Sequence, residues 1–103
     1  MNISHEVYKI SIVLPAKNEA GAIQQTVKAI KQLNRVDEII VVNDGSTDDT
    51  AQIAEQAGAK VISHPYSKGN GAAIKTGARN AIGDVIVFMD ADGQHDANDI
   101  SKL

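Results

Sequence analysis

The amino-acid sequence predicts an α/β fold, a doubly wound and mainly parallel sheet with helices on both faces. Two observations support this prediction. Short runs rich in β-branched residues alternate along the chain with stretches whose apolar residues recur at helical spacing, an order typical of βαβ units. Two of the runs, residues 37–43 and 84–90, carry apolar residues at consecutive positions, so both faces of these strands are expected to be covered, as in a parallel sheet.

Each expected element follows from its own residues. The strands are the four β-branched runs KISIVL (9–14), DEIIVVN (37–43), KVISH (60–64) and DVIVFMD (84–90). A helix is expected in each interval, because apolar side chains recur there on one face. These stripes are Ile23, Val27, Ile30 and Leu33 in the first interval, Ile53, Ala54 and Ala57 in the second, and Ile74, Ala78, Ala81 and Ile82 in the third. The small residues of the third stripe would let that helix approach the sheet closely.

Capping signals predict where the helices begin and end. The sequence STDD (46–49) supplies a Ser or Thr cap for the second helix and two acids for its first turn. Gly58 and Gly83 stand where helix C-terminal caps are expected. A last helix is expected to begin at Asp96, yet the sequence stops at Leu103. We therefore expect residues 1–103 to be an incomplete domain.

Composition excludes several classes of function. The chain has 103 residues, enough for one small domain. A net charge of −3 and only 3% aromatic residues argue against nucleic acid as a partner, which requires clustered basic residues and stacking platforms. The absence of cysteine excludes disulfides and thiolate metal sites. No signal peptide is expected at the start, and no apolar run approaches the length of a membrane span.

The candidate site lies where the strands end. Ligands of open α/β sheets bind beyond the carboxyl ends of the strands. The expected strands run into four polar loops, PAKNE (15–19), NDGSTDD (43–49), HPYSKGNG (64–71) and DADGQHD (90–96). Because parallel strands bring these ends to one edge, we expect the four loops to share a rim.

Two carboxylates at the end of the last strand indicate a metal site. Asp90 and Asp92 are two residues apart, so in extended backbone their side chains point to the same side and can share one hard cation. Gln94 could add a carbonyl oxygen. Mg²⁺ or Mn²⁺ held in this way keeps waters and takes substrate phosphates. The alternative is an Asp-Gly turn followed by an Asp helix cap, with no ligand.

Three further rim residues each have a functional and a structural interpretation. Asp44 follows a buried strand, where an acid can hydrogen-bond a nucleoside, but the same segment is good turn-and-cap chemistry. Glu19 could face the rim or be the first-turn acid of the first helix. Lys68, next to Gly69, could face a phosphate or belong to a solvated turn.

A phosphatase of the haloacid dehalogenase type is the main competing enzyme class. Its nucleophile loop reads Asp-x-Asp-Gly-Thr, in which the first Asp would attack phosphorus and the second would act as the acid. Asp90 and Asp92 fit those positions. Gln94 stands where the pattern requires Thr, and the motif follows the fourth expected strand instead of the first.

Four stretches together resemble the N-terminal half of a glycosyltransferase family 2 enzyme of the GT-A fold. They are SIVLPAKNEA (11–20), IIVVNDGSTDDT (39–50), SKGNGAAIKTGARNAIGD (67–84) and VFMDADGQHD (87–96). Each is weak alone, but their order and spacing are specific. The third and fourth are most similar to transferases that load a sugar onto dolichyl or undecaprenyl phosphate.

The resemblance implies a UDP- or GDP-sugar donor, a Mg²⁺ or Mn²⁺ ion, and transfer with inversion at the anomeric carbon. The nucleotide sugar would be bound by Pro15, Ala16, Asn18, Glu19 and Asp44 around the base and ribose, by Lys68 near the diphosphate, and by Asp90, Ala91 and Asp92 at the end of the last strand. The metal ion would be held by Asp90, Asp92 and Gln94.

The resemblance also implies what this portion would lack. In the family, the acceptor site and the general base come from the second half of the domain. We therefore expect the nucleotide-sugar-binding portion, residues 1–103, to transfer no sugar at a useful rate alone, and to self-associate through uncovered apolar faces. We also expect polyprenyl phosphate as the acceptor. The expected location is cytoplasmic, at the cytoplasmic face of the membrane if the protein is membrane-associated as full-length relatives can be. The non-enzymatic alternative is a nucleotide-binding or interaction remnant.

Overall fold

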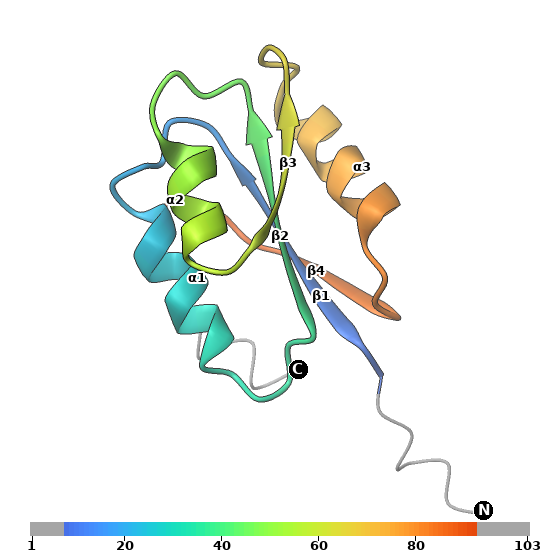
Figure 1. The fold of residues 1–103 in the computed structure, drawn as a ribbon. Coiled ribbons are helices and arrows are strands. Elements are labelled where there is room, and N and C mark those ends of the chain that lie inside the picture. Colours follow the sequence, from blue (N-terminus) through green and yellow to red (C-terminus); the bar gives the residue numbers. More distant parts are fainter. Residues whose placement is uncertain (1–7, 93–103) are drawn as a thin grey trace, which may run out of the picture.

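The computed structural model describes residues 8–92, and this part of the chain alternates strands and helices as the sequence predicts (Figure 1). The elements are β1 (Ile10–Ala16), α1 (Ile23–Lys31), β2 (Glu38–Asp44), α2 (Thr50–Gln56), β3 (Lys60–His64), α3 (Asn70–Asn80) and β4 (Val85–Phe88). The strands form one sheet in the order β3-β2-β1-β4, and every pairing in it is parallel. The predicted fold class is confirmed.

The sheet has a hydrophobic core on each face. α1 and α2 cover one face and α3 covers the other (Figure 1). Successive residues of β1 alternate between the two cores: Ile12 and Leu14 pack with α1 and α2, whereas Val13 packs with Ala73 of α3. All three β1 side chains are fully buried. β2 behaves in the same way, with Ile39 and Val41 in one core and Ile40 and Val42 in the other, so the predicted cover of both its faces is confirmed.

The last strand departs from that prediction. Val85 is 40% exposed and Phe88 is 44% exposed, although both belong to an unbroken apolar run. β4 lies beside β1 at the end of the described sheet. Val87 still packs against the core beneath α1 and α2, and Ile86 against the core beneath α3, so within residues 8–92 both faces of β4 are covered only in part.

The predicted helix ends need two corrections. α2 begins at Thr50 instead of after Ser46 or Thr47, and its N-cap residue, Asp49, makes no capping hydrogen bond through its side chain. α3 ends at Asn80, so Gly83 lies beyond its C-terminal cap. Gly58 directly follows the C-cap of α2, as predicted. The helix expected from residue 96 lies outside the described residues.

Close packing of α3 on the sheet depends on Gly77. A Cβ atom at this position would lie 2.2 Å from Cγ1 of Val13, which is itself fully buried. We expect Gly77→Ala to lower the free energy of unfolding by about 1–2 kcal/mol, because overpacking outweighs the gain in helix propensity. Urea unfolding measures this change. The control is Gly71→Ala on the same helix, where a Cβ would meet nothing within 4 Å. Equal stability of the Gly77 variant and the parent would contradict the packing argument.

Candidate functional site

The carboxyl ends of the strands form a rim with two adjoining pockets. The first has a volume of about 230 Å³ and is lined by Pro15, Ala16, Lys17, Asp44, Ser67, Gly69, Asn70 and Ala73. The second has a volume of about 220 Å³ and is lined by Pro15, Asn70, Ile74, Phe88, Met89 and Asp90. Pro15 and Asn70 belong to both linings, so the two pockets lie next to each other. The rim that the sequence predicts is therefore hollowed, and three predicted residues, Pro15, Ala16 and Asp44, line its first pocket.

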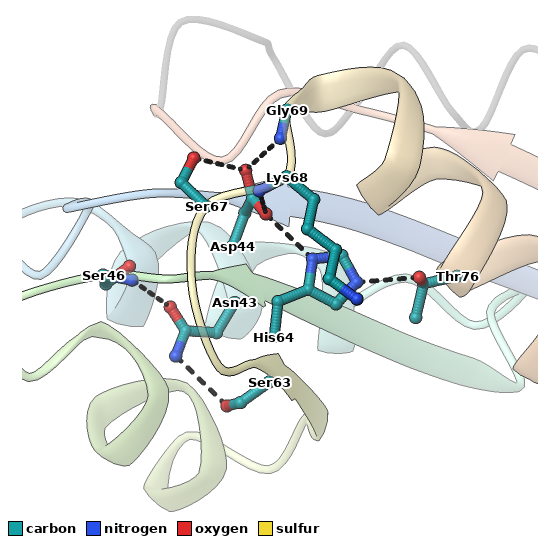
Figure 2. Close-up of polar contacts among 9 residues, drawn as sticks. All are labelled: Asn43, Asp44, Ser46, Ser63, His64, Ser67, Lys68, Gly69 and Thr76. Carbon is teal, nitrogen blue, oxygen red and sulfur yellow. Dashed lines mark hydrogen bonds and ion pairs between the residues drawn. The ribbon is translucent and has the colours of Figure 1, made fainter.

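Asp44, the last residue of β2, is the best-connected side chain of the rim (Figure 2). It is 5% exposed. Its Oδ1 accepts hydrogen bonds from Nδ1 of His64 and the backbone N–H of Lys68, each at 2.8 Å. Its Oδ2 accepts from Oγ of Ser67 at 3.0 Å and from the backbone N–H of Gly69 at 2.9 Å. A carboxylate has about four acceptor positions, so this one is fully used.

These bonds decide the charge of Asp44. Burial of the carboxyl raises its pKa, but hydrogen bonds from His64, Lys68, Gly69 and Ser67 outweigh burial and hold the pKa far below its usual range. Asp44 is therefore an anion throughout the neutral range, stabilised by donors of the chain itself.

His64 extends the network from the sheet to α3. The ring is 9% exposed, and its Nε2 lies 2.8 Å from Oγ1 of Thr76 (Figure 2). An ionised carboxylate can only accept, so Nδ1 carries the proton toward Asp44. In the neutral ring Nε2 then accepts from the Thr76 hydroxyl. Asp44, His64 and Thr76 thus join β2, β3 and α3.

The loop after β1 is held by the loop after β2. Oδ1 of Asn18 accepts from the backbone N–H of Thr47 at 2.8 Å, and the N–H of Asn18 donates to Oγ of Ser46 at 2.9 Å. The N–H of Glu19 donates to Oγ1 of Thr50 at 2.9 Å. Asn18 and Glu19 lie outside the linings of both pockets. Their visible role is to fix the position of the neighbouring loops.

The interpretation of Glu19 as a first-turn acid is wrong. α1 begins at Ile23 and has no acidic residue in its first turn. The carbonyl oxygen of Glu19 instead accepts hydrogen bonds from the N–H groups of Ala22 and Ile23, which lead into the helix.

Lys68 joins the site through its backbone, and its side chain extends elsewhere. The backbone N–H donates to Asp44, whereas Nζ lies 5.4 Å from the centroid of the Tyr66 ring. That ring is 66% exposed. The amine lies outside the linings of both pockets. Its contact with the diphosphate therefore stays a prediction.

The predicted metal ligands are only partly described. Asp90 lines the second pocket, Ala91 is buried and Asp92 is exposed. Gln94 lies outside the described residues. Within residues 8–92, no three His, Cys, Asp or Glu side chains gather around one metal position. Two carboxylates nevertheless fit a hard cation that takes its remaining ligands from water and phosphates.

Sequence reasoning missed several residues of the site. Ser67 and Asn70 line the first pocket, and His64 and Thr76 complete the hydrogen-bond network of Asp44. One signal could have revealed His64, because the parallel register pairs Asp44 with His64 at the ends of β2 and β3. Thr76 carries no such signal, since its contact depends on how α3 packs.

No helix between residues 8 and 92 combines the length and the apolar character that a membrane span requires.

The chain has relatives among known proteins. The sequence model described as glycosyl transferase family 2 matches residues 11–103. An uncharacterized protein of Methanocaldococcus jannaschii is 39% identical over an alignment 98 residues long, which covers 92% of this chain and 40% of that protein. The undecaprenyl-phosphate 4-deoxy-4-formamido-L-arabinose transferase of Proteus mirabilis is 33% identical over 115 residues, covering 100% of this chain and 35% of the relative.

Solved structures agree with the sequence matches. The crystal structure of Mycobacterium tuberculosis glucosyl-3-phosphoglycerate synthase superimposes with a TM-score of 0.75 at 39% identity, covering 82% of this chain and 35% of that one. A structure of this synthase with Mn²⁺, uridine diphosphate and glucosyl-3-phosphoglycerate gives a TM-score of 0.74 at 38% identity, covering 82% of this chain and 33% of that one. The chain thus spans well under half the length of the relatives that it matches.

Proposed function

Because the chain belongs to glycosyl transferase family 2 and has its GT-A fold, we propose that the rim of its sheet binds the nucleoside diphosphate of a UDP- or GDP-sugar together with a divalent cation. The observation that carries the proposal is the pair of adjoining pockets. One contains Pro15, Ala16 and Asp44, where the base and ribose would lie. The other contains Asp90, where the diphosphate would lie.

The cation would be held by Asp90 and Asp92. Both carboxylates follow β4, Asp90 lines the second pocket, and Gln94 is the proposed third ligand. A bound Mg²⁺ or Mn²⁺ would neutralise charge on the diphosphate and stabilise it as a leaving group. Structures of the similar synthase contain Mn²⁺ or Mg²⁺ with uridine diphosphate, which supports this choice of ion.

The activity of the whole protein is proposed to be sugar transfer with inversion. The names of the relatives support two kinds of acceptor. One relative is an undecaprenyl-phosphate sugar transferase, and another makes glucosyl-3-phosphoglycerate. Both acceptor types are phosphorylated, and polyprenyl phosphate would place the reaction at the cytoplasmic face of a membrane. The exposed Val85 and Phe88 of β4 support association with further polypeptide.

The competing enzyme class loses its support. A haloacid dehalogenase phosphatase is not the family that matches residues 11–103. Asp90 also follows β4, the last strand described, instead of β1. The non-enzymatic alternative is a nucleotide-binding or interaction remnant. An assay of sugar transfer, with donor and acceptor both supplied, distinguishes it from an enzyme.

Asp92 provides the test of the metal assignment. We expect Asp92→Asn to weaken the Mn²⁺-dependent binding of the preferred nucleoside diphosphate by about 30-fold, or about 2 kcal/mol, because a charged ligand is lost from a site with few protein ligands. Calorimetry against UDP and GDP, with and without Mn²⁺, measures this effect. Glu55→Gln, which removes an exposed acid on α2, is the control and should bind like the parent. Unchanged affinity and unchanged Mn²⁺ dependence in Asp92→Asn would refute the assignment.

A further inference from the structure

The loop of residues 65–69, which joins β3 to α3, converges on one carboxylate. Its consecutive residues Ser67, Lys68 and Gly69 all donate hydrogen bonds to Asp44, at 2.8 to 3.0 Å (Figure 2). Two of these donors are backbone N–H groups, so they fix the path of the main chain itself. The loop is therefore positioned by a residue more than twenty places earlier in the sequence.

Both ends of this loop are tied to the same anchor. His64 immediately precedes the loop and donates to Asp44, at 2.8 Å. Thr76 lies on the helix that follows the loop and contacts the other ring nitrogen of His64, also at 2.8 Å. One imidazole thereby connects the strand before the loop with the helix after it. A shift of α3 or of the loop would break bonds to a buried anion.

The loop also forms a wall of the proposed nucleotide pocket. Ser67 and Gly69 line the first pocket together with Pro15 and Ala16 of β1. All acceptor positions of Asp44 are already used by donors of the chain. A nucleoside group that bonded this carboxylate would have to displace one of them. The geometry therefore favours an indirect action of Asp44 on the ligand, through the loop.

We propose that Asp44, His64 and Thr76 form a latch that holds the loop of residues 65–69 in the position required for nucleotide binding. Asp44 and His64 are positioning residues of this latch, and Thr76 sets the orientation of the imidazole. This inference rests on the proposed function, because the loop matters to a ligand only if the first pocket binds one. The latch itself can be tested without any ligand.

Thr76→Val removes the hydroxyl of the latch while preserving the shape of the side chain. We expect the backbone N–H groups of Lys68 and Gly69 to exchange with deuterium at least about tenfold faster in this variant, because the bonds that protect them open more often. Thr76→Ser keeps the hydroxyl and should restore slow exchange. The matched control is Thr26→Val, since Thr26 is also half-buried and bonds the carbonyl of Ala22 within α1. That variant should leave exchange at both positions unchanged.

Calorimetric titration with UDP, GDP and the corresponding nucleosides, in the presence of Mn²⁺, tests positioning. We expect Thr76→Val to bind the preferred nucleoside diphosphate about three- to tenfold more weakly than the parent, and Thr76→Ser to bind like the parent. Unchanged exchange at Lys68 and Gly69 in Thr76→Val would overturn the latch. Faster exchange with unchanged affinity would overturn its positioning role. Absence of nucleoside diphosphate binding by the parent would contradict the proposed function. The exchange rates at Lys68 and Gly69 would still test whether the latch holds the loop.

Discussion

Replacing Asp44 with alanine is expected to lower the free energy of unfolding at neutral pH by about 3–5 kcal/mol. The carboxylate is buried and accepts four hydrogen bonds, two of them from backbone N–H groups that have no acceptor in the variant. Each buried donor left unsatisfied costs about 1–3 kcal/mol, partly recovered where the loop moves out to water. Urea unfolding followed by circular dichroism measures the loss. The matched control is Asp84→Ala, which removes an exposed carboxylate that bonds the backbone N–H of Lys9. Its cost should stay below about 1 kcal/mol.

The pH dependence of this difference has a definite sign. The folded-state pKa of Asp44 lies below that of the unfolded chain, so the unfolded state binds the proton more tightly. Its contribution to stability is therefore complete above the unfolded pKa, near 4, and is lost as the pH falls through the folded pKa. The difference in unfolding free energy between the parent and Asp44→Ala should narrow as the pH falls below about 4. A gap that did not change with pH would show that the loss comes from packing instead of the charge.

Gly45→Ala is expected to displace the loop of residues 65–69 and to cost at least about 3 kcal/mol of unfolding free energy. Gly45 has a positive φ of 70°, and a Cβ there would lie 2.4 Å from the backbone nitrogen of Ser67 and 2.7 Å from the backbone carbonyl carbon of Tyr66. Backbone atoms cannot rotate out of the way as the end of a side chain can. The whole loop therefore has to shift away from Asp44. The preferred nucleoside diphosphate should then bind at least tenfold more weakly.

Two other glycines separate the causes of that loss. Gly69 has a φ of +100°, but a Cβ would meet nothing within 4 Å, so Gly69→Ala should show only the backbone strain, about 1–2 kcal/mol. Gly21→Ala combines free space with an ordinary φ and should be close to neutral. Urea unfolding of the three variants should rank them in this order. Equal losses at Gly45 and Gly69 would show that loop contact contributes nothing.

Local patterns in the sequence account for most of the fold. Consecutive apolar residues predicted β2 as a strand with two covered faces, and Ile39 to Val42 are indeed all buried. The same signal overstated the cover of β4, where Val85 and Phe88 are exposed in residues 8–92. An apolar run indicates that burial would stabilise its side chains, but it does not indicate which other element buries them.

The start of α2 was mispredicted because distant contacts use the capping residues. Oγ of Ser46 accepts from the N–H of Asn18, and Oδ2 of Asp48 accepts from the N–H of Ala20. Oδ1 of Asp48 accepts from the N–H of Thr50, at the first residue of the helix. Ser46 and Asp48 thus hold the loop after β1. Capping preferences consider only the residues around a helix end, so they cannot predict such distant contacts.

The rim at the strand ends was predictable in its location but not in its hydrogen bonds. A strand followed by an acid indicated the rim and the position of Asp44 upon it. The four donors to Asp44 come from residues 64–69, and only the register of β2 and β3 brings them within reach. The metal pair Asp90 and Asp92 remains a prediction, with its proposed third ligand outside the described residues.

We expect the central place of β1 in the sheet to influence the order in which the strands assemble. Next to the start of β2, the N–H of Ile10 donates to Asp37, a sequence separation of 27 residues. Next to the start of β4, the N–H of Lys9 donates to Asp84, a separation of 75 residues. Closing the longer loop costs about 1 kcal/mol more chain entropy, and parallel pairing at such separations is slow. β4 is therefore expected to dock last, onto a sheet in which β1, β2 and β3 are already joined. Since Asp90 reaches the rim only with β4, the two pockets would become adjacent in the final step of folding.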